Sequence, residues 1–135
     1  MSTRIEHPTL YKEGAPGPLL LAARCTACSR VSFPRQQLGC EACGAHGEAM
    51  APAEIAARGT LLSFAAVRKH MGADIAAPFA IGEIRLDDGP VIRCTLDDAL
   101  NEADLRAGQI LVGRLAHNPK SGADVRELRF ALEGR

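Results

Sequence analysis

The sequence predicts a mainly β fold built from an N-terminal arm, a four-cysteine metal-binding ribbon and a small closed barrel. Two tight cysteine pairs lie near the amino end, and short apolar or alternating segments follow them at regular spacing. Turn signals rich in Gly, Pro and Asp separate these segments. We place the arm at residues 1–18, the ribbon at 19–52 and the barrel at 53–135.

Length and composition limit the classes of protein to consider. A chain of 135 residues supports one ordinary domain or two very small ones. Lys plus Arg and Asp plus Glu each number 16, so net charge does not favour nucleic acid or an anionic membrane. The chain lacks a run of about 20 apolar residues, and its start lacks the apolar core of a signal peptide. We expect a cytoplasmic protein with no membrane partner, whose thiols stay reduced.

The arm, residues 1–18, contains several residues that interrupt regular structure, and only 8–13 could form a short helix. Such an arm is either disordered or laid on a neighbouring surface. The interrupting residues are Pro8, Gly14, Pro16, Gly17 and Pro18.

The ribbon is predicted from the pairs Cys25-x-x-Cys28 and Cys40-x-x-Cys43, which eleven residues separate. Each pair can form a tight turn, and the two turns can face each other, so that four thiolates make a tetrahedral cage. Four protein ligands leave no open position for water or substrate. We therefore expect a structural zinc ion, while iron, as in rubredoxin, fits the same cage. A redox dithiol is disfavoured because two pairs face each other.

Short strands flank the first cysteine pair. Residues 19–24 are predicted to run into it as a strand, and 31–33 to form its hairpin partner, which Pro34 ends. Gly44 follows the second pair and suits the left-handed turn expected there, whereas Ser29 occupies the matching place less easily.

The barrel is predicted from five strand-like segments, after an alanine-rich linker at 51–58 that could hold one helical turn. Asp87-Asp88-Gly89-Pro90 is a strong turn signal between the second and third segments. Five strands with a short helix between the third and fourth indicate an OB-type barrel, although other five-stranded topologies share the pattern. The strands are placed at 59–68, 78–86, 91–96, 109–116 and 127–132, with the helix inside 97–105.

Alternation within the last strand predicts which side chains form the core. Leu128, Phe130 and Leu132 are expected to point inward, and Glu127 and Arg129 outward.

The ordered set of motifs resembles a family of small zinc-ribbon and OB-fold proteins, long labelled as a domain of unknown function, that accompany thiolase-like enzymes acting on acyl-CoA. The resemblance covers residues 19–132, with departures at Ser29, Arg35 and Gly39 that touch no metal ligand. The matching motifs are Arg24-Cys25-x-x-Cys28, Phe33-Pro34-Arg35, Cys40-x-x-Cys43-Gly44, Gly59-Thr-Leu-Leu-Ser-Phe64, Pro78-Phe79-Ala-Ile-Gly-Glu83-Ile-Arg-Leu86, Asp88-Gly89-Pro90 and Leu105-Arg-Ala-Gly108.

The resemblance implies a non-catalytic subunit that binds a thiolase-fold catalytic subunit, with two copies of each chain. The complex would bind a coenzyme A ester, and the small chain would help shape that site. Benzoylsuccinyl-CoA thiolase, which acts in aromatic-compound degradation, is a plausible relative. The resemblance assigns no catalytic residue to this chain and leaves the acyl group and the direction of reaction open.

Residues outside the cysteine cage are weaker candidates. Arg68, Lys69 and His70 follow the first barrel strand, and are either a solvated cluster or a rim facing coenzyme A phosphates or the partner. His46 is interpreted as a surface residue because the cage is already full. Cys94 is interpreted as a small buried residue, since no histidine lies near it in sequence.

Two further functions compete with the subunit hypothesis. A nucleic-acid-binding module would need a basic groove with aromatic stacking platforms, whereas Phe64 and Phe130 are expected in the core. A stand-alone enzyme would need a convergent acid–base pair, for which His70 and His117 are the only candidates. The carboxylate pairs at 87–88 and 97–98 are expected to cap and bend the chain rather than to catalyse.

Overall fold

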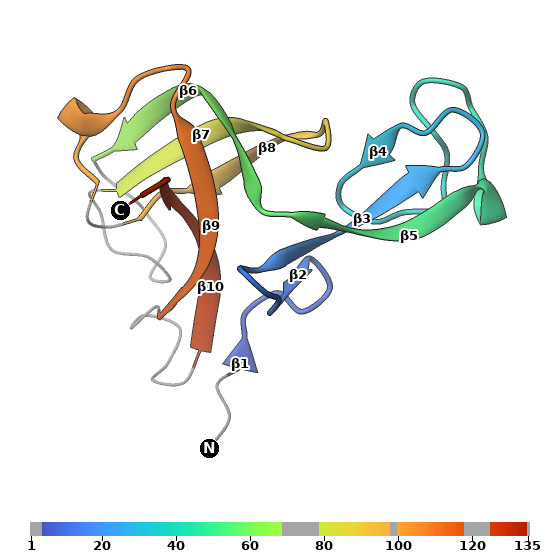
Figure 1. Ribbon diagram of the computed structural model, residues 1–135, viewed down its shortest axis with the longest axis horizontal. Helices are drawn as coiled ribbons and strands as arrows, with labels where there is room; N and C mark the ends of the chain where they lie inside the picture. Colours follow the sequence, from blue (N-terminus) through green and yellow to red (C-terminus); the bar gives the residue numbers. More distant parts are fainter. Residues whose placement is uncertain (1–3, 69–78, 98–99, 118–124, 135) are drawn as a thin grey trace.

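The computed structural model describes residues 4–68, 79–97, 100–117 and 125–134, and it is mainly β (Figure 1). Two sheets and two short 3₁₀ turns make up the regular structure of the described residues. The elements are β1 (Arg4–Ile5), β2 (Tyr11–Lys12), β3 (Leu19–Cys25), β4 (Val31–Ser32), η1 (Gly47–Ala49), β5 (Met50–Ala56), β6 (Arg58–Val67), β7 (Phe79–Leu86), β8 (Val91–Thr95), η2 (Glu102–Asp104), β9 (Ile110–His117) and β10 (Val125–Leu132).

The ribbon sheet is organised around β3, which pairs antiparallel with β4 and β2 along one edge and with β5 along the other. The predicted strand and hairpin around the first cysteine pair are therefore present. In Figure 1 the ribbon lies at one end of the molecule, and β5 leads from it into β6 and the barrel.

The expectation of a linker at 51–58 is wrong, because β5 occupies most of this segment. All seven residues of β5 pair with β3, from Met50 opposite Cys25 to Ala56 opposite Leu19. Alanine has a low strand propensity, which concealed the strand in the sequence. Pairing along the whole of β3 and burial of Met50 and Ile55 outweigh that propensity.

The possible helix at 8–13 is also absent. Tyr11 and Lys12 form β2, with Tyr11 opposite Leu20. The arm lies on the rest of the chain, because β1 pairs parallel with β10 and β2 pairs with β3. Tyr11 is 4% exposed, and burying its ring gives the extended conformation an advantage that an isolated short helix lacks.

The second sheet contains the five expected barrel strands, in the order β10-β9-β6-β7-β8, with β1 added at its edge. Its two ends meet through a parallel bridge between Leu96 and Phe130, and the Asp97 amide donates to the Phe130 carbonyl at 2.8 Å. Gly59 allows β6 to cross closely, since a Cβ there would lie 2.3 Å from the Arg85 carbonyl oxygen. This closed arrangement confirms the OB-fold prediction.

The short helix predicted between the third and fourth barrel strands is a single 3₁₀ turn, η2. Its Asp104 side chain accepts a hydrogen bond from the Asn101 amide at 3.1 Å, which closes the turn on itself. Leu105 follows in an extended conformation and is 5% exposed, so its anchoring in the core ends the turn.

One hydrophobic core runs through both parts of the chain. It joins Leu20 and Ile55 of the ribbon sheet to Leu61 and Leu111 of the barrel, with the fully buried Phe130 among them. Phe64 packs against the same core. The expected inward positions of Phe64, Leu128, Phe130 and Leu132 are confirmed.

Arg129 departs from the expected outward position, because it is 4% exposed. Its Nε and Nη2 atoms donate to Oε1 of Glu127 at 3.0 and 2.7 Å. Alternation predicts the face on which a side chain lies but not what covers that face. Charge-assisted hydrogen bonding offsets part of the cost of removing the guanidinium from water.

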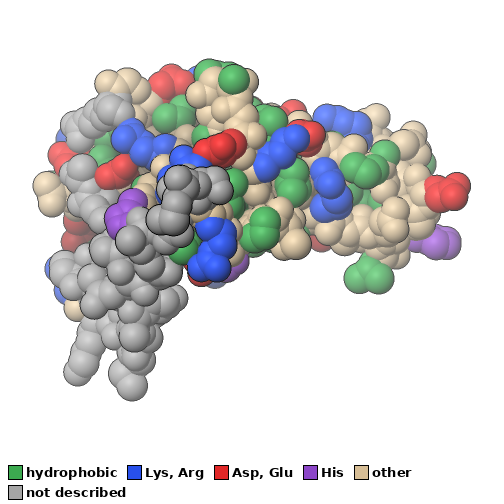
Figure 2. All heavy atoms as spheres, turned by 90° about the horizontal axis from the view of Figure 1, so that it is seen from below, with side chains coloured by type: hydrophobic (Ala, Val, Ile, Leu, Met, Phe, Trp, Pro, Cys, Tyr) green, Lys and Arg blue, Asp and Glu red, His purple; other side chains and the backbone are tan. Residues whose placement is uncertain are grey.

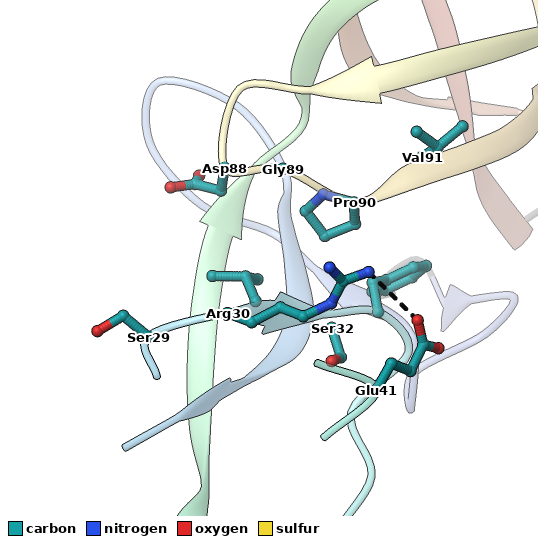
Figure 3. Close-up of a pocket in the computed structure, with 10 residues that line it drawn as sticks. Ser29, Arg30, Ser32, Glu41, Asp88, Gly89, Pro90 and Val91 are labelled. Atoms are coloured by element: carbon teal, nitrogen blue, oxygen red, sulfur yellow. Dashed lines mark hydrogen bonds and ion pairs between the residues drawn. The ribbon is translucent and has the colours of Figure 1, made fainter. Parts of the chain in front are cut away.

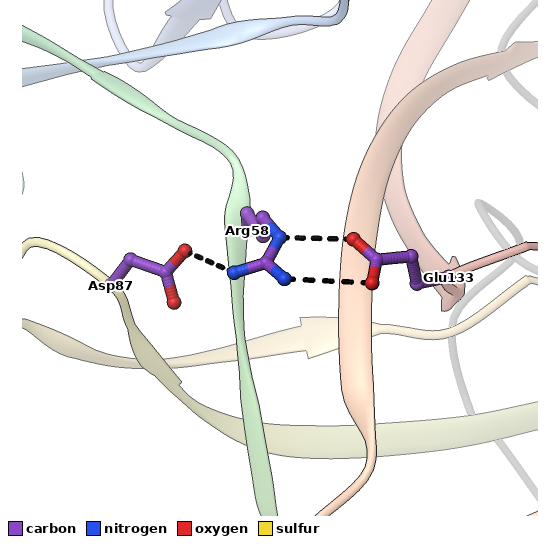
Figure 4. Close-up of polar contacts among 3 residues, drawn as sticks. All are labelled: Arg58, Asp87 and Glu133. Atoms are coloured by element: carbon purple, nitrogen blue, oxygen red, sulfur yellow. Dashed lines mark hydrogen bonds and ion pairs between the residues drawn. The ribbon is translucent and has the colours of Figure 1, made fainter.

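Arg58 ties three parts of the barrel together (Figure 4). Its Nη1 lies 2.6 Å from Oδ2 of Asp87 in the β7–β8 turn, and its Nε lies 2.9 Å from Oε2 of Glu133 after β10. These carboxylates raise the pKa of Arg58, with Glu133 as the larger cause. Among the described residues, none of the helices has the length and apolar character needed to cross a membrane.

Candidate metal centre

The cysteine pairs lie in two turns with the same hydrogen-bond pattern. In the first turn, the Cys25 amide donates to the Arg30 carbonyl at 2.8 Å and the Ser29 amide to the Cys25 carbonyl at 2.7 Å. In the second, the Cys40 amide donates to the Ala45 carbonyl at 2.7 Å. The Gly44 amide donates to the Cys40 carbonyl at 2.9 Å. Each turn therefore folds the chain back so that both cysteines of a pair face the same point.

The residue after each pair adopts a left-handed backbone conformation. Gly44 has φ 78° and Ser29 has φ 71°, and Ser29 is the one non-glycine residue with positive φ in the described chain. The sequence predicted this pair of positions correctly. Serine can adopt the conformation, although its Cβ makes it less favourable than for glycine.

The four sulfur atoms converge into one cluster. The Sγ atoms of Cys25, Cys28, Cys40 and Cys43 all lie within 4.8 Å of one another. Cys25 and Cys43 are separated by 3.5 Å, as are Cys28 and Cys40. A tetrahedral ion with metal–sulfur bonds of about 2.3 Å would place neighbouring sulfurs about 3.8 Å apart. The cluster therefore has the ligand type, number and spacing for such an ion.

The first cysteine of each pair, Cys25 or Cys40, lies in a backbone environment that favours its thiolate form. Backbone N–H groups of Cys43 and Ala42 lower the pKa of Cys40 to about 6. The N–H groups of Cys28 and Ala27 likewise lower the pKa of Cys25. Thiolates are the form that binds metal, so the turns favour the binding form in two of the four ligands. The pKa of Cys28 is instead raised to about 12 and that of Cys43 is also raised, so a bound cation would have to displace the protons of these two thiols.

The surroundings make the centre structural rather than catalytic. Cys25 and Cys40 are buried in a small cluster with Ala23 and Met50, while Cys28 and Cys43 are exposed. His46 is exposed and lies outside the sulfur cluster, as expected. Since four cysteines fill a tetrahedron, a substrate would find no open coordination position.

A groove lies beside the ribbon, where it faces the β7–β8 hairpin (Figure 3). The groove has a volume of about 480 Å³ and runs between β4 and the turn that contains Asp88. Arg30 and Glu41 pair within it, Nη2 to Oε2 at 3.2 Å, and Val91 is 52% exposed beside it. Sequence reasoning did not find this groove, because it forms only when the ribbon and the barrel are placed side by side.

Of the three predicted rim residues, the structure describes one. Arg68 follows β6, and its Nη2 lies 2.7 Å from Oε2 of Glu102 in η2. Its side chain is 75% exposed. Lys69 and His70 lie outside the described residues. Arg68 therefore has a protein partner and also remains accessible to an anion.

Cys94 lies in an environment that the sequence did not predict. The partly buried thiol donates to the Leu128 carbonyl at 3.6 Å, and it lines a second cavity together with His7 and Tyr11. Burial raises the pKa of Cys94 to about 12, so the thiol is a poor nucleophile at neutral pH. The fold brings His7 to this cavity across most of the sequence, which is why proximity in sequence gave no signal.

The acidic pairs have structural roles where they are described. Asp87 pairs with Arg58, and Asp97 lies 3.6 Å from Nη1 of Arg114. On the face drawn in Figure 2, Lys and Arg side chains are interspersed with Asp and Glu. The described residues of that face form no continuous basic stripe.

Comparison with known proteins identifies both parts of the chain. Residues 14–48 match the family described as "ChsH2, rubredoxin-like zinc ribbon domain", and residues 53–114 match "ChsH2, C-terminal OB-fold domain". No curated protein matches the sequence significantly. A solved structure described as "Ltp2-ChsH2(DUF35) aldolase" resembles this chain with a TM-score of 0.61 and 19% identity, over 81% of this chain and 84% of that chain. With these two domains in this order, the chain belongs to the ChsH2 zinc-ribbon and OB-fold family.

Proposed function

We propose that the chain is a non-catalytic, zinc-binding subunit of a thiolase-fold complex that acts on acyl-CoA. The four-cysteine centre would hold zinc and keep the ribbon folded. The active-site residues would belong to the partner, and this chain would stabilise the partner and help shape the acyl-CoA site. A dimeric partner would bind two copies of it.

One observation carries the proposal: both ChsH2 domains are present, and their fold matches a chain described as part of an Ltp2-ChsH2 aldolase. That description names two components, which supports an assembly of this chain with a catalytic partner. The four-thiolate centre also supports a structural role for this chain and a catalytic role for the partner, because the centre would stabilise the ribbon without offering an open coordination position.

The side chains of the chain itself also favour a non-catalytic role. Cys94 is the thiol outside the metal cluster, and its pKa of about 12 keeps it protonated at neutral pH. Asp87 and Asp97 are each engaged by an arginine. These three groups are thus held in structural contacts.

We further propose that Arg68, Lys69 and His70 face the partner or the phosphates of coenzyme A. Arg68 is 75% exposed and is held by Glu102 at the end of β6, so its position is fixed while its guanidinium remains accessible. Replacing all three with alanine should weaken binding of a coenzyme A ester to the complex while leaving partner capture intact. If the triple alanine variant bound the coenzyme A ester as tightly as the wild type, these residues would not belong to the proposed site.

The test is an affinity pull-down of the tagged chain from its native host, with mass spectrometry of the eluate. We expect an identified thiolase-fold protein to be recovered with the wild-type chain and to be reduced with Cys43→Ser. Recovery of the chain alone, loaded with zinc, would contradict the subunit proposal. Filter binding to single-stranded oligonucleotides at low salt would then test the nucleic-acid alternative.

A further inference from the structure

We propose that the cavity between β8, β10 and the N-terminal arm binds a small uncharged molecule that carries one hydroxyl or carbonyl group. The cavity has a volume of about 260 Å³. It is separate from the metal centre, and it adjoins the groove beside the ribbon at Phe33, which lines both. Its lining comes from four parts of the chain: His7, Leu10 and Tyr11 of the arm, Phe33 after β4, Ile92, Arg93, Cys94 and Thr95 of β8, and Glu127 and Leu128 of β10.

The position of the cavity follows from how the barrel closes. β8 and β10 meet through the bridge between Leu96 and Phe130, near one end of each strand. Away from this bridge the Cys94 thiol of β8 contacts the Leu128 carbonyl of β10 at 3.6 Å. The arm covers the gap that remains, with Tyr11 held against β3 by its pairing with Leu20.

The feature that points to a ligand is the hydroxyl of Tyr11. The residue is 4% exposed and lines the cavity, and although the backbone of Leu128 lies toward its Oη atom, no acceptor for the hydroxyl hydrogen is found among the described residues. Buried hydroxyl groups are normally hydrogen-bonded, because an unpaired one loses its bonds to water without compensation. A bound molecule with a hydroxyl or carbonyl group would supply the missing partner.

The charges around the cavity favour an uncharged ligand. Glu127 pairs with Arg129 at 2.7 Å, and Arg93 pairs with Glu83 at 3.4 Å, so both charged groups of the lining strands are balanced. The Cys94 thiol is protonated at neutral pH and bonded to Leu128. The remaining walls are largely apolar, with Leu10, Phe33 and Ile92 among them. A charged ligand would lose hydration without gaining a counterion.

The volume sets the size of the ligand. A cavity of about 260 Å³ is comparable to the space of about nine water molecules at about 30 Å³ each. This is below the range typical of sites for drug-sized molecules. A single ring or a short branched chain is therefore the appropriate class, and cyclohexanol is a suitable probe.

The chain contains its own reporter for this site. Tyr11 is the only tyrosine and there is no tryptophan, so the tyrosine fluorescence of the full-length protein comes from this cavity alone. Cys94 is a second, independent reporter. Because its thiol is protonated at neutral pH, its slow alkylation by excess iodoacetamide is followed at mildly alkaline pH, and peptide mass mapping distinguishes it from the metal-binding cysteines. Both should be measured on the zinc-loaded protein.

We expect cyclohexanol to change the Tyr11 fluorescence and to slow alkylation of Cys94, with one saturable midpoint on the order of 1 mM. Cyclohexanecarboxylate, which has the same ring with a charged group, should do neither at the same concentration. Tyr11→Phe keeps the ring and removes the hydroxyl, so the midpoint for Cys94 protection should rise roughly threefold to tenfold. Cys94→Leu should fill the cavity and abolish the fluorescence change.

The outcomes separate a binding site from a cavity that holds only water. No saturable response of either reporter to cyclohexanol would overturn the proposal. Equal protection of Cys94 in wild type and Tyr11→Phe would overturn the role of the hydroxyl, as would equal binding of the carboxylate. If one variant fails to fold, the paired wild-type titrations with the neutral and charged probes still decide the question.

Discussion

Ser29 and Gly44 occupy equivalent positions in the two metal-binding turns, and both have left-handed backbone angles, φ 71° and φ 78°. Both amides donate to the carbonyl of the first cysteine of their pair. Glycine adopts this conformation without steric cost, whereas a residue with a Cβ does not. The two turns are therefore alike in geometry and unequal in strain.

This inequality predicts opposite effects of two substitutions. Gly44→Ala should destabilise the zinc-loaded protein by about 1–2 kcal/mol. The added Cβ would meet no atom within 4 Å, but alanine would have to adopt the unfavourable left-handed φ of this position. Ser29→Gly should be neutral or stabilise by up to about 1 kcal/mol. Denaturant unfolding measures both, and Gly39→Ala, in the same ribbon, is the control. A larger loss for Ser29→Gly than for Gly44→Ala would refute the explanation.

Removing one sulfur ligand should release the metal. Cys25→Ser is expected to lose zinc and to leave the ribbon without the centre that joins its two turns, at a cost of several kcal/mol. Amide hydrogen exchange should accelerate around β4 first, while β9 retains more protection through the barrel core. Cys94→Ala is the matched control and should keep full zinc content. Full occupancy in Cys25→Ser would exclude the four-ligand site.

The bridge from Arg58 to Asp87 and Glu133 predicts a salt-dependent contribution to stability. Arg58→Met should lower the melting temperature at low ionic strength, and the difference from wild type should shrink as salt rises, because the side chains are about 42–49% exposed. A double-mutant cycle with Glu133→Gln should reveal the coupling. Arg106→Met, at an exposed arginine, is the control. Equal salt responses of the two variants would show that the bridge contributes nothing.

Cys94 predicts a loss of stability at alkaline pH. Its pKa is raised from 9.0 to about 12, so the folded state holds the proton more tightly than the unfolded state does. The stabilisation is complete below pH 9 and falls as pH rises from about 9 to about 12. At pH 10.5 the loss from this group is about 2 kcal/mol. Cys94→Ala should show a shallower decline over this range, and parallel curves for the two proteins would contradict the prediction.

Most of the fold could be predicted from the sequence, because its strongest indications of structure depend on residues close together in the chain. The cysteine spacing, the Asp-Gly turn and the inward side chains of the last strand depend on neighbouring residues, and all were found where they were expected. The features it did not reveal depend on distant partners. β5 is alanine-rich and became a strand by pairing with β3, and β2 was fixed by burial of Tyr11.

The candidate sites divide in the same way. The metal cluster could be predicted because all its ligands lie within two short turns. The second cavity could not, since His7, Cys94 and Glu127 come from three distant segments that meet only after the barrel closes. The burial of Arg129 was equally hidden, because alternation gives the face of a strand and not what packs over it.

Native mass spectrometry of the affinity-purified assembly tests the central claim most directly, because one mass reports composition and metal content together. The account predicts a complex of this chain with a thiolase-fold protein, two copies of each, carrying one zinc for every copy of this chain. A free, zinc-loaded chain under the same conditions, or a complex whose formation is unaffected by Cys25→Ser, would contradict it.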